Sequence, residues 1–223
     1  MRSRRSCVIP LLIVLAGLAR PLAGAPAALN RTDWVIEEMP GGHVTVGSEA
    51  LVIDDVAGCT VWYRPKLTAP VEISYDVTVV AHGGPNDRVS DVNCFWMATD
   101  PRAPEGCPFA AGHGRSGRFT DYDSLQTYYV GMGGNTNSTT RFRRYGHGTK
   151  PLLPQYDRRD SAVLLQPNHT YHIRVVMRDG KAEYWRDGVN VFTYADPHPL
   201  TSGWFAFRTV KSHLEIRNFH VGH

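Results

Sequence analysis

Residues 128 to 145, "YYVGMGGNTNSTTRFRRY", concentrate side chains that could bind a ligand. Two tyrosines lead into a Gly-Gly-Asn corner, and three arginines then fall within four positions before Tyr145. Side chains on a β-strand alternate between its two faces. One face would therefore carry Asn137, Thr139, Arg141, Arg143 and Tyr145, and the other Ser138, Thr140, Phe142 and Arg144.

Arg141 and Arg143 predict a carboxylate-binding surface. At two-residue spacing on one strand, their Cα atoms lie about 7 Å apart. A guanidinium binds a carboxylate through two parallel hydrogen bonds, which lysine does less well. The natural partner is a uronic-acid sugar or another anionic glycan, held in a groove across the sheet. The alternative is a solvated edge strand that its arginines keep soluble.

Aromatic and glycine residues of the same stretch suit a sugar site. Tyr128, Tyr129 and Tyr145 supply ring faces for sugar C–H groups and a phenol for hydrogen bonding. Three glycines allow a bend or a close backbone approach: Gly131, Gly133 and Gly134. Asn135 is expected to adopt a left-handed backbone conformation and to help bind the ligand.

The stretch "NDRVSDVNCFW" is the second candidate. Alternation places Asp91 and Asn93 with Phe95, and Val92, Cys94 and Trp96 opposite. With Arg88 in the preceding loop, this end of a strand could face the same groove. The alternative is a turn whose Asp and Asn cap the loop.

The sequence offers few acid–base groups for hydrolysis. Glycoside hydrolysis needs two carboxyl groups at a set separation, and the acids near these motifs are Asp91, Asp121 and Asp123. The E-x-D-x-x-E pattern of retaining sandwich glucanases is absent. The candidate bases are histidines: His82, His113, His147 and His172.

This residue set favours a polysaccharide lyase. A lyase must neutralise a uronate carboxylate, remove the proton beside it and protonate the leaving oxygen, for which Arg or Asn and then Tyr or His are suited. The predicted catalytic residues are Arg141, Tyr128, Tyr145, His82 and His147. The predicted substrate-binding residues are Arg143, Asn93, Asn135, Asp91, Arg88 and Tyr129. Two alternatives stay open, namely a non-catalytic carbohydrate-binding module and a glycoside hydrolase that uses Asp91 with Asp121 or Asp123.

The scaffold that positions these residues is predicted to be all-β. In "VEISYDVTVV", Ile73, Tyr75, Val77 and Val79 alternate with polar residues, and "TYHIRVVMRDG" repeats the pattern. Asp-Gly pairs at 179–180 and 187–188 predict consecutive hairpins. Two further strands are expected in "GWFAFRT" and "HLEIRNFHV", with a bulge near Asn218. Strands joined by short turns, without crossover helices, indicate an antiparallel two-sheet jelly-roll sandwich over residues 25–223.

The N-terminus predicts export. Arginines at positions 2, 4 and 5 precede a short apolar run and the small residues of "PLAGAPAA", so residues 1–24 are expected to be a cleaved signal peptide. The protein is then secreted, extracellular or periplasmic, without a membrane segment. Removing Cys7 leaves three cysteines, of which Cys94 and Cys107 are predicted to form a disulfide while Cys59 is buried.

Composition limits the partners. The net charge of +3 comes from interspersed acids and bases, which does not suit nucleic-acid binding. No zinc motif is present, no cofactor is predicted, and a structural calcium ion stays open. The expected partner is an acidic polysaccharide or oligosaccharide, and the oligomeric state is not predicted.

The motifs "GWFAFRTVKSHLEIRNFHV", "HTYHIRVVMRDGKAEYWRDG" and "NDRVSDVNCFWMATDP", with the opening stretch, resemble concanavalin A-like jelly rolls. Over residues 32 to 221 the chain is similar to a YesU-like group of secreted bacterial sandwich proteins associated with polysaccharide breakdown. The resemblance implies the lectin/glucanase type of fold and a carbohydrate ligand. "YYVGMGGN" is also faintly similar to a strand of alginate-lyase-type jelly rolls, but Gly133 stands where those enzymes have a catalytic tyrosine, so no role is transferred by position.

Overall fold

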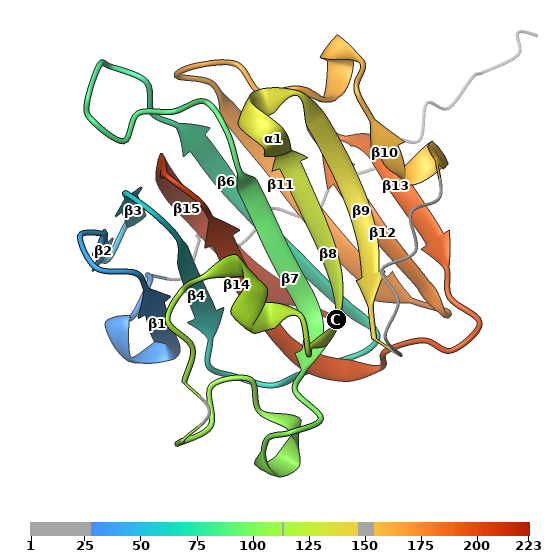
Figure 1. The fold of residues 1–223 in the computed structure, drawn as a ribbon. Helices are drawn as coiled ribbons and strands as arrows, with labels where there is room; N and C mark the ends of the chain where they lie inside the picture. Colours follow the sequence, from blue (N-terminus) through green and yellow to red (C-terminus); the bar gives the residue numbers. More distant parts are fainter. Residues whose placement is uncertain (1–27, 113, 147–153) are drawn as a thin grey trace, which may run out of the picture.

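The computed structural model describes residues 28–112, 114–146 and 154–223, which form two antiparallel β-sheets packed face to face (Figure 1). The predicted two-sheet sandwich is confirmed. The expected signal peptide lies outside the described residues and stays a prediction.

The first sheet, called sheet A, has eight strands. In spatial order they are β1 (Trp34–Glu38), β4 (Cys59–Tyr63), β14 (Ser202–Thr209), β7 (Val92–Thr99), β8 (Gln126–Gly133), β9 (Thr139–Tyr145) and β10 (Asp157–Arg158), while β5 (Leu67–Thr68) pairs with β14. The outer face of sheet A, which faces away from the second sheet, carries the candidate site.

The second sheet, called sheet B, has seven strands. Their order is β13 (Val189–Ala195), β12 (Lys181–Arg186), β11 (Thr170–Arg178), β6 (Val71–Val79), β15 (Ser212–Gly222), β3 (Leu51–Asp55) and β2 (His43–Val46). Positive φ angles at Asp179, Gly180, Asp187 and Gly188 form the two predicted hairpin turns. The predicted bulge is confirmed by the register shift between Arg217 and His220, where Asn218 has φ +53°.

Short helical segments occupy the connections. They are η1 (Arg31–Asp33), η2 (Pro104–Gly106), η3 (Phe119–Tyr122), α1 (Gly134–Asn137), η4 (Pro154–Tyr156) and η5 (Ser161–Val163). The four-residue α1 joins β8 to β9 and contains left-handed residues, including Asn135 at φ +52° as predicted. Within the described part of the chain, no helix is long and apolar enough to cross a membrane.

The main core lies between the sheets and follows the predicted alternation. Along β6, Ile73, Tyr75, Val77 and Val79 are buried while the residues between them are partly exposed. Phe142 on β9 enters the same core, where its ring contacts Trp96 and Phe192. The inward face of the arginine-rich strand therefore contributes an aromatic ring to the core.

A second apolar cluster covers part of the outer face of sheet A. Its sheet residues include Trp62, Phe95 and Trp204, and the long β7–β8 connection packs over them. This connection, called the flap (residues 100–112 and 114–125), adds Phe109 and Phe119 to the cluster. The flap contains the two short helical segments η2 and η3.

The predicted disulfide between Cys94 and Cys107 is wrong, because both thiols are free. Cys94 points into the core between the sheets, whereas Cys107 packs with the flap cluster on the other side of sheet A. A strand residue that faces inward cannot reach a loop that covers the outer face. Burial raises the pKa of the Cys94 thiol to about 12, so it remains a neutral core residue. Cys59 is buried, as predicted.

Candidate functional site

A cavity of about 380 Å³ opens on the outer face of sheet A beside the flap. We call it the arginine pocket. Its lining residues are Arg88, Asp91, Asn93, Phe119, Tyr129, Gly131, Gly134, Asn135, Thr136, Thr139, Arg141, Arg143, Tyr145 and Val210. Both predicted motifs thus contribute to one site.

Strand register explains why these residues meet. One row of directly paired residues crosses sheet A as Glu37, Thr60, Arg208, Asn93, Gly131, Arg141 and Asp157. The neighbouring row runs Trp62, Ala206, Phe95, Tyr129 and Arg143. The first row is mostly polar and the second mostly aromatic, so the pocket has a charged side next to a ring-lined side.

Two arginines of β9 share one carboxylate. Nε of Arg141 donates to Oδ1 of Asp157 at 2.8 Å, and Nη2 of Arg143 lies 3.6 Å from Oδ2 of the same residue. The Arg141 side chain is 31% exposed, whereas that of Arg143 is 6% exposed. Burial lowers the pKa of the Arg143 guanidinium, although Asp157 opposes this effect. Since one carboxylate balances only one of two guanidinium charges, this side of the pocket keeps a positive charge.

Asn135 lies at the mouth of the pocket. With its side-chain oxygen turned towards the Thr139 hydroxyl and the Arg141 guanidinium, that oxygen accepts from Nη1 of Arg141 at 3.2 Å and from Nη2 at 2.9 Å. Asn135 is exposed, so a ligand oxygen can replace its amide oxygen on Arg141.

The opposite side of the pocket is held by Arg88. Its Nη2 donates to Oδ2 of Asp91 at 2.6 Å, and its Nε donates to the Lys211 carbonyl at 2.9 Å. Asp91 also accepts from the Ser90 hydroxyl at 2.6 Å. Asp91 is therefore an ion-paired carboxylate with its position fixed by two neighbours.

Tyr129 and Tyr145 form the aromatic floor. Their ring centroids lie 5.6 Å apart, and Phe119 from the flap lies 5.9 Å from Tyr129. A Cβ on Gly131 would come within 2.6 Å of the Tyr129 hydroxyl, so the glycine makes room for this phenol. Burial, together with nearby Tyr145 and Asp91, holds the pKa of Tyr129 well above its usual value. Burial and Asp123 raise the pKa of Tyr145 to about 12.

Eight of the predicted site residues line the arginine pocket: Arg88, Asp91, Asn93, Tyr129, Asn135, Arg141, Arg143 and Tyr145. Tyr128 does not, because it faces the core between the sheets, where its hydroxyl donates to Asp196 at 2.8 Å. His82 is exposed in the loop after β6 and does not line the pocket. His147 and His113 lie outside the described residues. His172 bonds to Asp76 on sheet B at 2.7 Å.

The structure does not bring the predicted hydrolase carboxylates together in this pocket. Asp121 lines a different cavity with Arg115 and accepts from the Ser116 hydroxyl at 2.7 Å. Asp123 is exposed near the end of the flap and does not line the arginine pocket. Among the described lining residues, Asp91 is the one carboxylate.

Sequence reasoning missed residues that only the tertiary fold places. Phe119 arrives with the flap, Val210 comes from the turn after β14, and Asp157 pairs with β9 through β10. Glu37 lies buried under the flap and accepts from Trp62 Nε1 at 2.8 Å and from the Tyr122 hydroxyl at 2.9 Å. No local motif marks any of them.

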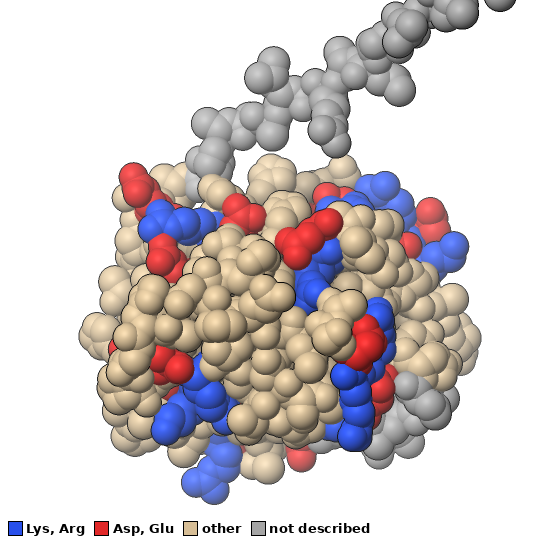
Figure 2. All heavy atoms as spheres, turned by 90° about the horizontal axis from the view of Figure 1, so that it is seen from above, with Lys and Arg blue, Asp and Glu red and all other residues tan. Residues whose placement is uncertain are grey.

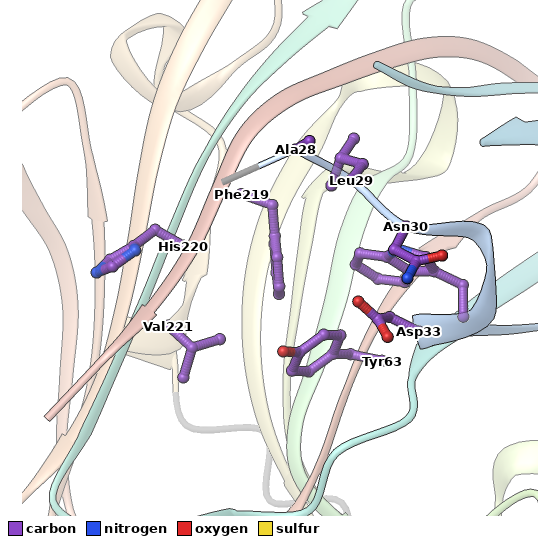
Figure 3. A pocket seen from close by; sticks show the side chains of 9 residues that line it. Ala28, Leu29, Asn30, Asp33, Tyr63, Phe219, His220 and Val221 are labelled. Atoms are coloured by element: carbon purple, nitrogen blue, oxygen red, sulfur yellow. The ribbon is translucent and has the colours of Figure 1, made fainter. Parts of the chain in front are cut away.

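A smaller cavity of about 200 Å³ lies beside the start of the described chain, next to β15 (Figure 3). Figure 3 shows the Asp33 carboxylate near the Tyr63 ring, with Phe219 facing them and His220 directed away. None of the predicted site residues lines this cavity.

Viewed from the end that carries α1, charges of both signs are interspersed and most of the surface is uncharged (Figure 2). Across the described residues, no group of three potential metal ligands converges.

Comparison with known proteins places this architecture among galectin-like and concanavalin A-like β-sandwiches. A Bacillus subtilis protein of unknown function with a galectin-like fold matches with a TM-score of 0.63 at 16% identity, over 85% of this chain and 89% of its own. The carbohydrate-binding module CBM66 from Bacillus subtilis matches at 0.55 and 10% identity, over 86% and 96%. A β-1,3-1,4-glucanase (lichenase) from a mouse hindgut metagenome matches at 0.52 and 13% identity, over 86% and 92%.

Residues 53–219 match the family described as a domain of unknown function, DUF6250. The chain belongs to this family. The search of curated proteins found no match to the chain. The YesU-like affiliation expected from the sequence stays a prediction.

Proposed function

We propose that this protein is a secreted carbohydrate-active protein whose arginine pocket binds an acidic, uronate-containing saccharide. The observation that carries the proposal is the shared carboxylate, since Asp157 balances only one of the two guanidinium charges of Arg141 and Arg143. A ligand carboxylate supplies the missing charge and can bond to a guanidinium through both oxygens. Lysines would supply the charge without the planar geometry.

The floor of the pocket suits a sugar ring. The rings of Tyr129 and Tyr145 offer apolar surface next to polar side chains, as small-molecule sites commonly do. The similarity in fold to a carbohydrate-binding module and to a glucanase supports a saccharide ligand. Fold alone leaves the chemistry open.

Eliminative cleavage is the reaction that this residue set suits best. Arg141 and Arg143 would neutralise the uronate carboxylate and so acidify the neighbouring C–H bond. The proton passes to the Asp91 carboxylate, the C–H electron pair forms the new C=C bond, and the C–O bond to the leaving sugar breaks. Tyr145, which a pKa of about 12 keeps protonated at neutral pH, donates the proton to the departing oxygen. Proton transfer through solvent then restores both groups.

Binding without cleavage is the second candidate, and a specific observation favours it. Asp91 is the one carboxylate among the described lining residues, and it is already engaged by an ion pair with Arg88 and a hydrogen bond from Ser90. A carboxylate whose oxygens already accept from two neighbours is poorly placed to take a proton from the substrate. Such a pocket would retain an acidic saccharide without turning it over.

The test incubates the protein, without residues 1–24, with a panel of acidic and neutral polysaccharides. An increase in ultraviolet absorbance from unsaturated uronate, with matching products in mass spectrometry, supports the lyase. Retention on an acidic polysaccharide without products supports the binding module. Products heavier by one water, without absorbance, would contradict both, and so would an absence of binding and products across the panel.

A further inference from the structure

Asn93 brings an unsatisfied hydrogen-bond acceptor to the arginine pocket. The residue is 4% exposed, and its Oδ1 has no hydrogen-bond partner among the described residues. Its Nδ2 lies 3.4 Å from Oδ1 of Asp91. Because an ionised carboxylate only accepts hydrogen bonds, this contact fixes which end of the amide is the oxygen. Oδ1 is therefore an acceptor that lacks a donor.

Arg208, which is paired with Asn93 on the adjacent strand, has unsatisfied donors. The residue is 1% exposed, and its Nη1 donates to the Thr60 hydroxyl and to the Gly117 carbonyl. Its Nε and Nη2 have no partner among the described residues. The rings of Phe119 and Tyr122 lie 5.4 and 5.1 Å from its guanidinium carbon. Such contacts stabilise the faces of the guanidinium and leave its in-plane N–H groups unsatisfied.

Arg208 also differs from the arginines that line the pocket. Arg88 pairs with Asp91, and Arg141 and Arg143 pair with Asp157. Arg208 makes no ion pair with any carboxylate in the described ranges. A buried charge without a partner is costly, so a group that accepts from Arg208 would be bound favourably.

The register of sheet A places these two side chains next to each other. Arg208 on β14 is directly paired with Asn93 on β7, and both side chains project to the outer face with those of the neighbouring aromatic row. Directly paired residues have Cβ atoms about 5 Å apart. Phe119 lines the arginine pocket and also stacks on Arg208. Its ring therefore contacts both the pocket and the Arg208 guanidinium, which does not itself line the pocket.

We propose that the arginine pocket continues beneath Phe119 into a subsite for one sugar hydroxyl, formed by Asn93 and Arg208. A hydroxyl is both donor and acceptor, so it can donate to Oδ1 of Asn93 and accept from Nε of Arg208. A carboxylate cannot replace it there, because it has no proton for Asn93. With the carboxylate at Arg141 and the hydroxyl at Arg208, the uronate ring has one orientation. This inference rests on the proposed function.

Occupation of the subsite requires the Phe119 ring to turn aside. Phe119 is partly exposed at the start of η3. Tyr122, three residues later, is buried and anchored to Glu37. The flap can thus keep its attachment to the sheet while the Phe119 side chain changes rotamer.

The test measures binding of the methyl glycosides of galacturonate and glucuronate, and of their mono-O-methyl ethers, by calorimetry. An ether oxygen accepts a hydrogen bond but cannot donate one. Methylation at one ring position should therefore weaken binding to the wild-type protein by roughly 10- to 100-fold. In an Asn93→Leu variant the parent uronoside should bind weakly, and this discrimination should disappear.

An Arg208→Gln variant and the double variant complete a mutant cycle. A shared hydroxyl predicts that the two substitutions together cost less affinity than the sum of their separate effects. Thermal melting identifies a variant that fails to fold, in which case the ether series with the wild type and Asn93→Leu decides alone. The subsite is refuted if every ether binds like its parent, or if Asn93→Leu retains the discrimination. If Arg141→Gln weakens binding while both subsite variants bind like the wild type, the subsite fails and the proposed function stands. If the wild type binds neither a uronoside nor any acidic polysaccharide of the panel, the proposed function fails and the subsite with it. If it binds an acidic polysaccharide but no uronoside, the subsite alone is refuted.

Discussion

Replacing Arg141 by glutamine tests whether Arg141 and Arg143 bind a ligand carboxylate, with little disturbance to the fold. Arg141 is partly exposed on β9, and Arg143 remains in place to pair with Asp157. Glutamine removes the charge and the planar pair of donors while keeping a polar side chain. Hydrogen bonds to charged groups contribute about 1.5–3 kcal/mol, and solvent screening at this exposure reduces the figure to about 1–2 kcal/mol. We therefore expect the dissociation constant for an acidic saccharide to rise roughly 5- to 30-fold.

The matched control is Arg158→Gln. Arg158 lies on the adjacent strand β10 and pairs with Asp160 at 2.8 Å, and it does not line the pocket. Calorimetric titration of both variants with the acidic saccharide should show a loss of affinity for Arg141→Gln alone. High salt should reduce the difference in affinity between the wild type and Arg141→Gln. Equal affinity of the wild type and Arg141→Gln at low salt would refute the assignment of Arg141 as a carboxylate-binding residue.

Three further changes test the surroundings of the pocket. Gly131→Ala places a methyl group against the Tyr129 hydroxyl, so saccharide affinity should fall several-fold in titrations while the melting temperature changes little; unchanged affinity would mean that this phenol does not shape the site. Burial raises the pKa of Glu37, so its contribution to stability is complete below the pKa of the unfolded state and is lost as pH rises through the pKa of the folded state. Glu37→Gln should flatten this part of the pH–stability curve measured by denaturant unfolding, and a curve identical to that of the wild type would contradict the raised pKa of Glu37. Asp196→Ala leaves the buried Arg144 without its ion-pair partner, so the free energy of unfolding measured in urea should fall by about 3–5 kcal/mol. A loss under 1 kcal/mol would show that this ion pair does not stabilise the fold.

Alternation along strands accounts for what the sequence predicted well. Arg141, Arg143 and Tyr145 share one face of β9, as their spacing requires, and Asn93 lies on the matching face of β7. The same rule could have removed Tyr128, since adjacent residues of a strand face opposite ways and Tyr129 already faces the pocket. It could also have excluded the disulfide, because Cys94 was assigned to the face opposite Asn93.

The remaining residues depend on pairings that sequence distance hides. Asp157 reaches Arg141 only because β10 pairs with β9, and Arg208 reaches Asn93 only because β14 lies between β4 and β7. Phe119 depends on how the flap packs against aromatic residues from several strands. Periodicity within one segment contains no information on which strands become neighbours.

The most direct test of the central claim compares one acidic polysaccharide with its carboxyl-reduced form, which keeps the linkages and loses the charge. The protein without residues 1–24 is run through affinity gels that contain either polymer, for each acidic polysaccharide of the panel. We predict retardation by at least one acidic polymer and migration like a non-binding control in its reduced counterpart. Equal retardation by both forms, or none by any acidic polymer, would contradict the account.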